Sequence, residues 1–437
     1  MMNNTLHFLK QLVPQGMKNI LWHFPLVVFA AVCFGMPARK LKVIGITGTN
    51  GKTTVTQLVT KILLGAGRKV SMASTINFVM DGKETVNASK YTTLSAWKLQ
   101  QFLHDAVRSG AEYAVIETSS HAIDQYRIFG IPYEIAVMTN VTREHLDYHH
   151  TMAEYRQVKR KLFVRAKHAV VNLDMESPEE YLDAKSFEQK IAYSTHNPQA
   201  TLLAEQLKLS LQGSEFVVDG TPFRLALPGL FNVENALAAI GVGMLCGIEK
   251  GVMSRILREV TVIPGRMERI ANNRGITILI DYAVTPDALE KLYSLISRMN
   301  SQMNTNGSII ALLGACGERD RGKRPMMGEI VSSYADTLIL TNEDPYYEDP
   351  NQIIDDIEKG LPESLRESSR AGIVKTAGKE YFRIFDRREA ITQALALANT
   401  NDIVVITGKG AEETMKIGAE CIPWNDARVV REELEKL

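Results

Sequence analysis

Short runs of apolar, β-branched residues alternate along this chain with longer stretches of amphipathic, helix-forming composition. Residues 42–47 (KVIGIT) and 113–118 (YAVIET) are runs of the first kind, and residues 52–67 form a stretch of the second kind that ends in Gly-Ala-Gly. Apolar runs bounded by helices predict strands that are buried on both faces, as in a parallel sheet with crossover helices. The pattern therefore predicts an α/β fold with a mostly parallel sheet.

Further runs of this kind divide the chain into two successive α/β units. Strands are predicted at 133–140 and 168–174, antiparallel hairpins between 190 and 228, and a helix at 232–245. Pro264-Gly265 is a strong turn signal, and the α/β alternation restarts after it. The later strands are predicted at 276–283, 308–315, 336–343 and 402–410. We therefore predict a short apolar helical segment at 1–42, a central domain at 43–264 and a Rossmann-like C-terminal domain at 265–437.

Residues 20–37, ILWHFPLVVFAAVCFGMP, form the one membrane-like stretch of the sequence. They are fewer than the ~20 apolar residues that a membrane-spanning helix needs, and they include His23 and Pro25. We predict a helix packed on the domain that follows, with contact with a membrane surface and a membrane span as alternatives. No cleavage site of small residues follows the stretch, so we expect a cytoplasmic protein.

Composition and charge narrow the class of protein. Apolar residues make up 45% and charged residues 23% of the 437 residues, as in ordinary globular proteins of two or three domains. Lysines and arginines total 50, and aspartates and glutamates also total 50, so no net charge favours nucleic acid as a partner. The four scattered cysteines include no C-x-x-C pair, which argues against a structural zinc site or a disulfide framework.

Residues 45–54, GITGTNGKTT, lie between the first predicted strand and the first predicted helix. Glycines there let backbone N–H groups approach phosphate oxygens, and the helix directs its positive end at them. We expect Lys52 to reach the terminal phosphates and the Thr53 hydroxyl to bind Mg²⁺. The alternative is a glycine-rich turn that only caps the helix, but the strand–loop–helix order favours a P-loop ATPase domain.

Polar residues also follow two further predicted strands. Glu117, in ETSSHAIDQYR (117–127), ends a strand near the phosphate loop, where a carboxylate is well placed to hold a metal ion. His145 lies in TNVTREHLDYH (139–149), after the next strand. Taken alone, such a histidine is more often structural than a ligand.

These segments, in this order, resemble the Mur ligase family, and within it the MurE branch of UDP-N-acetylmuramoyl-tripeptide synthetases. The family's shortened loop, G-x-x-G-K-T, also accounts for Ile46. The resemblance covers residues 43 to about 430. Besides the three segments above it rests on Y-x-x-x-K (155–159) and on residues 227–239, 264–270, 281–290, 317–325, 341–350, 386–391 and 408–413.

The resemblance implies an ATP-dependent amide ligase that adds the third, diamino-acid residue to UDP-N-acetylmuramoyl-L-Ala-D-Glu in peptidoglycan precursor synthesis. Members of the family use ATP and Mg²⁺ to phosphorylate a carboxylate, and the amine of a free amino acid attacks the acyl phosphate. A carboxylate is a poor electrophile and phosphate a good leaving group, so catalysis consists of positioning and neutralisation of charge. We expect a monomer that acts on a nucleotide-sugar peptide.

The resemblance also implies roles for particular residues. Thr53, Glu117 and His145 would hold Mg²⁺, and Lys159 would be carbamylated and help to hold a second metal ion, which requires a neutral amine. A solvent-facing helix lysine is the alternative for Lys159. Lys52, Lys159 and His145 are the expected catalytic residues. Expected nucleotide contacts are Gly48, Thr49, Asn50, Gly51, Lys52, Thr53, Thr54, Asn232, Arg266 and Asp281, and expected contacts with the muramoyl peptide are Thr92, Thr93, Ser119, Gln125 and Arg127.

The incoming amino acid is expected to bind to residues of the C-terminal domain, namely Arg319, Glu343, Asp344, Tyr346, Gly408 and Glu412. Where diaminopimelate-adding members have D-N-P-R, this chain has Glu343-Asp344-Pro345-Tyr346. It therefore lacks the arginine that pairs with a far carboxylate. This difference favours lysine or ornithine, while diaminopimelate stays open because a nearby lysine can replace the arginine.

Other departures from the family bear on function. Leu94, Val284 and Ala411 replace a proline and two histidines, and residues 1–42 are too few for the family's N-terminal UDP-binding domain, which we expect to be missing. Three alternatives follow: a folylpolyglutamate-like ligase, a ligase on a lipid-linked acceptor that contacts the membrane through residues 20–37, and a nucleotide-binding scaffold without activity.

Overall fold

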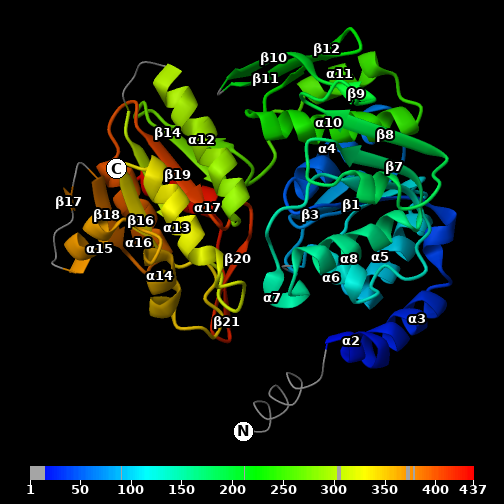
Figure 1. The fold of residues 1–437 in the computed structure, drawn as a ribbon, viewed down its shortest axis with the longest axis horizontal. Helices are drawn as coiled ribbons and strands as arrows, with labels where there is room; N and C mark the ends of the chain where they lie inside the picture. The colour runs from blue at the N-terminus through cyan, green and yellow to red at the C-terminus, as the bar shows by residue number, and fades with distance from the viewer. Residues whose placement is uncertain (1–14, 90, 211, 303–306, 371–374, 377–378) are drawn as a thin grey trace.

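The computed structural model describes residues 15–89, 91–210, 212–302, 307–370, 375–376 and 379–437. Residues 1–14 of the predicted N-terminal segment lie outside this part. The described chain forms two α/β domains, each built on a mostly parallel sheet with helices on both faces (Figure 1). The predicted fold class is confirmed, whereas the exact domain boundaries stay a prediction.

The sheet of the first domain has nine strands in the order β4-β3-β2-β5-β1-β6-β7-β8-β9. Neighbouring strands from β2 to β9 are parallel, and β3 and β4 form an antiparallel hairpin at one edge. The strands are β1 (Lys42–Thr47), β2 (Val70–Ala73), β3 (Asn77–Met80), β4 (Lys83–Val86), β5 (Tyr113–Glu117), β6 (Tyr133–Met138), β7 (Ala166–Asn172), β8 (Gln189–Ser194) and β9 (Leu202–Leu203).

Helices cover both faces of this sheet because its strands are apolar on both sides. Val43 of β1 packs into the core on one face, and Ile44 and Ile46 pack into the core on the other. The second core is closed by α4 (Lys52–Gly65), α10 (Leu230–Leu245) and α11 (Lys250–Arg258), and the first by α5 (Ala96–Arg108) and α8 (Met152–Phe163). Three short helices connect these elements: α6 (Ser120–Asp124), α7 (Leu146–His149) and α9 (Glu179–Leu182).

A separate antiparallel sheet follows, made of β10 (Glu205–Ser210), β11 (Gly213–Val218) and β12 (Thr221–Leu225). The prediction of antiparallel hairpins holds for these strands. It was wrong for β8 and β9, which join the large sheet in parallel. The edge of the sheet is formed by β9, which has only two residues. β8 begins with two exposed residues, Gln189 and Lys190, so its sequence lacks the continuous apolar run of a strand that is buried on both faces.

The sheet of the second domain has seven strands in the order β13-β14-β19-β15-β16-β18-β17, antiparallel only at its two edges. The strands are β13 (Glu268–Ile270), β14 (Thr277–Asp281), β15 (Ile309–Leu313), β16 (Thr337–Leu340), β17 (Lys375–Thr376), β18 (Lys379–Arg383) and β19 (Ile403–Thr407). One face is covered by α12 (Pro286–Gln302), α13 (Lys323–Tyr334), α14 (Pro350–Glu358) and α15 (Glu363–Arg370), and the other by α16 (Arg387–Leu397) and α17 (Asp426–Leu434). A hairpin of β20 (Thr414–Ile417) and β21 (Glu420–Pro423) completes the domain.

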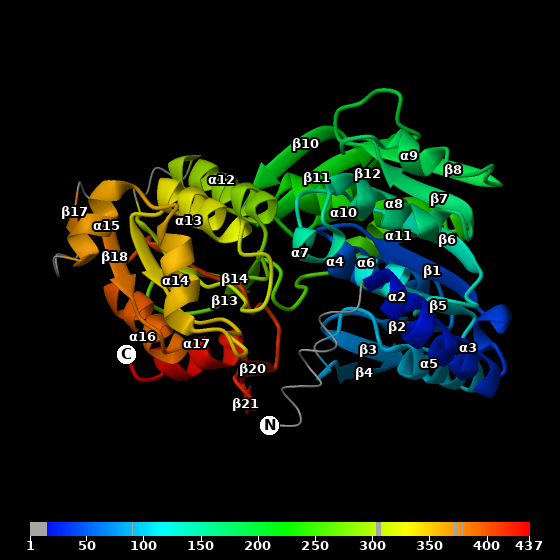
Figure 2. The same ribbon diagram turned by 60° about the horizontal axis from the view of Figure 1, so that its bottom comes forward.

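The predicted N-terminal helix is present and packs on the first domain, beside α5 (Figure 2). It consists of α2 (Gln15–Lys18), the π-helical turn η1 (Asn19–His23) and α3 (Phe24–Cys33), and the 3-10 turn η2 (Pro37–Lys40) leads from it into β1. Val27, Ala30 and Ala31 are buried against the domain. By length and composition, Gly16–Cys33 is also apolar enough to cross a membrane.

Candidate active site

A cavity of about 490 Å³ lies where the carboxyl ends of the parallel strands of the two domains face each other. Segments that follow β1, β5 and β6 form one wall, and segments that follow β14, β15 and β16 form the other. The domains also make direct contacts there, since the Asn50 side chain donates to Asp287 at 3.0 Å and Arg266 donates to the Thr53 hydroxyl at 3.0 Å. This is the position at which open α/β sheets bind ligands.

Most of the residues predicted from the sequence line this one cavity. They are Thr49, Asn50, Gly51, Lys52, Thr53, Thr54, Thr92, Thr93, Glu117, Ser119, Gln125, Arg127, His145, Asn232, Arg266, Asp281, Arg319, Glu343, Asp344, Tyr346 and Glu412. Gly48, Lys159 and Gly408 lie behind the wall instead. The structure thus brings the predicted residues together, while the role of each residue stays a prediction.

The phosphate loop owes its shape to two glycines. Gly51, at φ 84°, precedes the first residue of α4, and a Cβ atom there would lie 2.3 Å from the Asn235 side-chain oxygen. A Cβ atom on Gly48 would lie 1.8 Å from the Thr139 hydroxyl oxygen. The Lys52 ammonium donates to the carbonyl oxygens of Gly48 (3.2 Å) and Thr49 (2.8 Å), so it lies against the loop. A glycine-containing loop that leads into a helix N-terminus with a lysine suits phosphate.

Oxygen ligands for a metal ion lie directly below this loop. The Thr53 hydroxyl donates to both carboxylate oxygens of Glu117 at 3.1 Å, and the Thr75 backbone N–H also donates to Glu117 at 2.8 Å. Glu117 is almost fully buried. In the part of the chain that the structure describes, no three histidine, cysteine, aspartate or glutamate side chains form a group that could hold a metal ion by themselves. A hydroxyl and one carboxylate fit Mg²⁺, which usually takes its remaining ligands from phosphate and water.

His145 stands on the same wall, at the start of α7, with a left-handed φ of 57°. Its ring centre lies 4.6 Å from that of His121. Burial, and then the charge of His121, hold the pKa of His145 well below its usual range. The imidazole is therefore neutral at physiological pH, which is the form that binds a metal ion.

Lys159 is buried in α8 and is not a solvent-facing helix residue. Its ammonium nitrogen donates to the Gly48 carbonyl at 2.8 Å and lies 4.5 Å from the Tyr155 ring centre. Burial, and then the charge of Lys52, hold the pKa of Lys159 well below its usual range. Both effects favour the neutral, nucleophilic form of the amine directly behind the phosphate loop.

Four of the five residues expected to contact the muramoyl peptide form one hydrogen-bonded group around Thr93: Thr93 itself, Ser119, Gln125 and Arg127. The Thr93 hydroxyl donates to the Glu117 carbonyl at 2.8 Å and accepts from the Ser119 N–H at 2.9 Å. Arg127 donates to the Thr93 carbonyl at 3.1 Å and also to Gln125. These contacts attach the group to the end of β5, next to the metal ligands.

At the far end of the cavity a fully buried lysine lies among carboxylates. Lys409 donates to Asp344 at 2.8 Å and to Glu412, and these two carboxylates keep its pKa raised despite its burial. The acid-rich motif is therefore largely neutralised. Burial raises the pKa of Glu343 to about 7, and among the described residues its Oε2 atom accepts no hydrogen bond.

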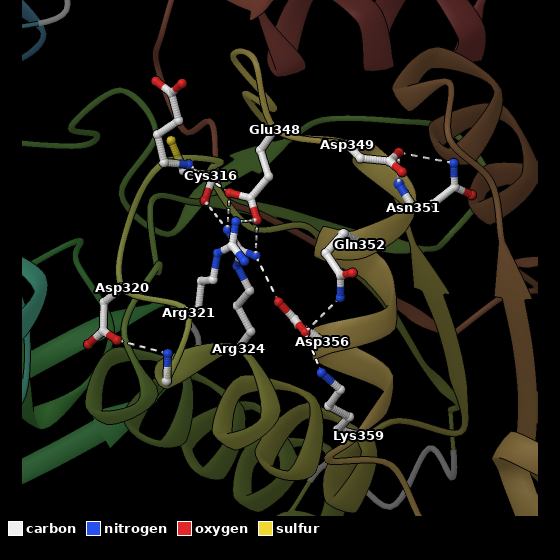
Figure 3. A network of polar contacts seen from close by, with 12 residues as sticks. Cys316, Asp320, Arg321, Arg324, Glu348, Asp349, Asn351, Gln352, Asp356 and Lys359 are labelled. Atoms are coloured by element: carbon white, nitrogen blue, oxygen red, sulfur yellow. Dashed lines mark hydrogen bonds and ion pairs between the residues drawn. The ribbon is translucent and has the colours of Figure 1, made fainter. Parts of the chain in front are cut away.

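A buried arginine holds the loop that carries Arg319 (Figure 3). Arg324 lies between Glu348 and Asp356 and donates to them at 2.7 and 3.0 Å. It also donates to the Cys316 carbonyl at 3.2 Å. Arg324 thereby connects the loop between β15 and α13 to the segment that follows β16. Arg319, in the middle of this loop, is exposed to solvent and lines the cavity.

Sequence reasoning missed several residues of the cavity wall. His121 lies inside the quoted segment 117–127, and burial lowers its pKa to about 3. Glu144 and Lys323, 179 residues apart, form an ion pair of 3.0 Å between the domains. Asp287 binds Asn50 across the same boundary. Glu144, Lys323 and Asp287 also lie inside segments that carry the resemblance, but their pairings depend on how the domains face each other and could not be predicted from the sequence.

Comparison with known proteins agrees with the resemblance that the sequence motifs carry. Residues 46–243 match the model of the Mur ligase middle domain, and residues 265–410 match the Mur ligase, glutamate ligase domain. A UDP-N-acetylmuramyl-tripeptide synthetase of Roseiflexus sp. is 37% identical over 94% of this chain and 82% of its own length. A UDP-N-acetylmuramoyl-L-alanyl-D-glutamate–2,6-diaminopimelate ligase of Bacillus cereus is 35% identical over 93% of this chain and 81% of its own length. A solved structure of a ligase with the second of these names matches 91% of this chain and 78% of its own, with a TM-score of 0.59 and 32% identity.

Proposed function

Since this chain belongs to the Mur ligase family, a family of ATP-dependent ligases, we propose that it joins a diamino acid to UDP-N-acetylmuramoyl-L-alanyl-D-glutamate. The reaction belongs to peptidoglycan precursor synthesis and consumes ATP. The four cysteines are all free, as expected in the reducing cytoplasm where we place the protein.

The observation that carries this proposal is the single cavity shared by three groups of side chains. The phosphate loop with Lys52 lies at one end, the Thr93–Arg127 group lies beside it, and the Lys409 cluster lies across the domain boundary. A ligase of this type needs ATP, a carboxylate and an amine within one space, because the activated carboxylate hydrolyses if it is released.

The reaction proceeds in two steps, phosphorylation of the acceptor and attack by the amine. A carboxylate oxygen of the acceptor attacks the γ-phosphorus of ATP, which gives an acyl phosphate and ADP. The amine nitrogen then attacks the acyl carbon, loses a proton, and inorganic phosphate leaves with the electron pair of the broken C–O bond. Lys52 and Arg266 stabilise the negative charge on the transferred phosphoryl group, and Ser119 and Arg127 orient the acceptor.

We assign the metal sites to residues that fit them chemically. Thr53 and Glu117 would hold one Mg²⁺ ion, and neutral His145 together with carbamylated Lys159 would hold a second. The ions supply positive charge that neutralises the phosphate oxygens. The burial and the lowered pKa of Lys159 support its carbamylation, since carbon dioxide reacts with neutral amines and a lowered pKa favours that form.

For the incoming amino acid we propose a far end that is an ammonium group, as in lysine or ornithine. Tyr346 stands where a guanidinium would be needed for a far carboxylate. Lys409 does not replace that guanidinium, because its charge is already paired with Asp344 and Glu412. Glu343, whose Oε2 atom accepts no hydrogen bond from the described residues, supplies a carboxyl group for the ammonium.

The decisive experiment is ligation of UDP-N-acetylmuramoyl-L-Ala-D-Glu with ATP and Mg²⁺, with lysine, ornithine and diaminopimelate in parallel and mass spectrometry as readout. We expect a product with lysine or ornithine and release of ADP and phosphate. Preference for diaminopimelate would contradict the assignment of the far end but not the ligase activity. ATP binding without any product would support a scaffold instead.

A further inference from the structure

The N-terminal helical segment carries a concentrated apolar surface. Eight of the twenty large apolar side chains that are exposed in the described part of the chain lie between residues 17 and 32. Trp22 is 72%, Leu21 68% and Val32 62% exposed. We call this surface the N-terminal apolar face, formed by Met17, Ile20, Leu21, Trp22, Leu26, Phe29 and Val32. Contiguous apolar surfaces of this kind mark contact with a partner or a membrane.

The opposite side of the same segment is fixed to the protein. Val27, Ala30 and Ala31 are buried, and the Phe24 ring meets Tyr126 and Phe129 edge-on, with ring centres 5.3 and 5.1 Å apart. Phe34 packs edge-on against Trp97 of α5 at 4.9 Å. A helix held along its length in this way cannot cross a bilayer without losing these contacts. It can lie in the plane of a membrane surface, with only its exposed side in the lipid.

The charges around this face complement an anionic lipid surface. The first acidic residue of the sequence is Asp81, so the N-terminal segment itself carries none. Lys18 lies at one end of the helix and exposed Arg39 and Lys40 follow the other end, while exposed Lys98 is next to Trp97. Two carboxylates of neighbouring elements have partners: Asp124 accepts from Asn19 at 2.7 Å and pairs with Lys161 at 3.4 Å, and Asp105 lies 3.2 Å from a ring nitrogen of His104.

Exposed tryptophans on this surface support lipid as the occupant over a second protein. Trp22 and Trp97 are both exposed, and the exposed Lys98 follows Trp97. Indole rings favour the boundary between headgroups and acyl chains of a membrane. Basic residues near an anionic membrane strengthen binding by electrostatic attraction. An apolar helix side with a basic border is the pattern of interfacial membrane helices.

We infer that residues 15–40 bind this protein peripherally to a bilayer that contains anionic phospholipids, with the N-terminal apolar face in the interface. The same segment touches the acceptor side of the cavity. Asn19 and the Tyr148 hydroxyl both donate to Asp124, and Phe24 packs on the loop between Gln125 and Arg127. Membrane binding therefore brings the acceptor-binding side of the protein to the bilayer surface.

Flotation with lipid vesicles tests this inference without any substrate, so the outcome is independent of the proposed ligase activity. The full chain is mixed with vesicles of phosphatidylcholine alone or with about 30% phosphatidylglycerol. We expect flotation with the anionic vesicles, a blue shift of tryptophan emission, and weaker binding at high salt. Binding to neither kind of vesicle would overturn the inference.

Variants identify the surface. The triple variant L21N/W22S/F29N should bind at least ~10-fold more weakly, because three side chains no longer enter the interface. The matched control V86N/L207N/V262N changes three exposed apolar residues elsewhere and should bind like the wild type. Charge reversal with R39E/K40E leaves the helix intact and should also weaken binding to anionic vesicles. Equal binding of all variants, or a dimer that L21N/W22S/F29N converts to a monomer without any vesicle binding, would refute the assignment.

Discussion

Replacing Glu343 by glutamine keeps the shape of a buried carboxyl group and removes its ability to ionise. Burial raises the pKa of Glu343 from 4.5 to about 7. The folded state therefore holds a proton that the unfolded state releases, and the stability of the wild type falls as the pH rises from 4.5 to about 7. Glutamine has no such dependence.

The size of the effect follows from the two pKa values. A rise from 4.5 to about 7 corresponds to roughly 3 kcal/mol of unfolding free energy. We expect the free energies of unfolding of E343Q and wild type to be similar near the lower pH and to differ by about 3 kcal/mol, in favour of E343Q, above the higher one.

Urea unfolding at a series of pH values, followed by circular dichroism, measures this difference. The control E420Q removes an exposed carboxylate and should leave the pH dependence of the wild type unchanged. If E343Q and wild type keep the same pH dependence, Glu343 is not held in its protonated form and the reasoning on the amino-acid end of the cavity is wrong. Addition of lysine should reduce the difference, because an ammonium group favours the ionised carboxylate.

Three further substitutions test other parts of the site. K159A should lose at least ~100-fold in ligation rate while the neighbouring exposed-lysine control K161A keeps it, and full activity of K159A would rule out the carbamate. G48A should weaken ATP binding at least ~10-fold, because the Cβ atom of the alanine would lie 1.8 Å from the Thr139 hydroxyl oxygen. The control G82A adds a Cβ atom in an open turn and should leave ATP binding unchanged. Titration calorimetry measures the ATP affinity of both variants. R387M leaves Asp426 buried without the arginine that donates to it at 2.8 and 2.7 Å, so the free energy of unfolding should fall by about 3–5 kcal/mol. The double variant R387M/D426L removes the buried carboxylate as well and should recover part of this loss. An unchanged free energy of unfolding in R387M would contradict a structural role of Arg387.

The strands show how far the sequence pattern predicts the fold. The all-apolar runs that became β1, β5, β6, β14, β15 and β19 were predicted because both faces of a parallel strand are buried. The hairpin of β3 and β4 was missed although Asp81-Gly82 is a turn signal. The parallel pairing of β8 and β9 was not predicted, because the sequence of a strand says little about which strand it pairs with or in which direction.

The phosphate loop shows which part of the candidate site could be predicted from the sequence. Its glycines, lysine and threonine are contiguous, and a local backbone conformation follows from local sequence. The Lys409 cluster is different. The sequence shows two adjacent acidic residues at 343–344. Lys409, 65 residues away from Asp344, forms an ion pair with it, so the negative charge of Asp344 is neutralised within the protein.

The sequence by itself thus determined much of the local structure, namely the buried central strands, the helices that follow them and the loop at 48–53 with its glycines. Only the tertiary structure decided which charges cancel, as at Lys409, and which amine is buried with a lowered pKa, as at Lys159. The physical reason is that backbone geometry depends on neighbours along the chain, whereas burial and charge pairing depend on neighbours in space. The apolar stretch at 20–37 follows the same rule: its composition predicted a helix, and only packing showed which side is exposed.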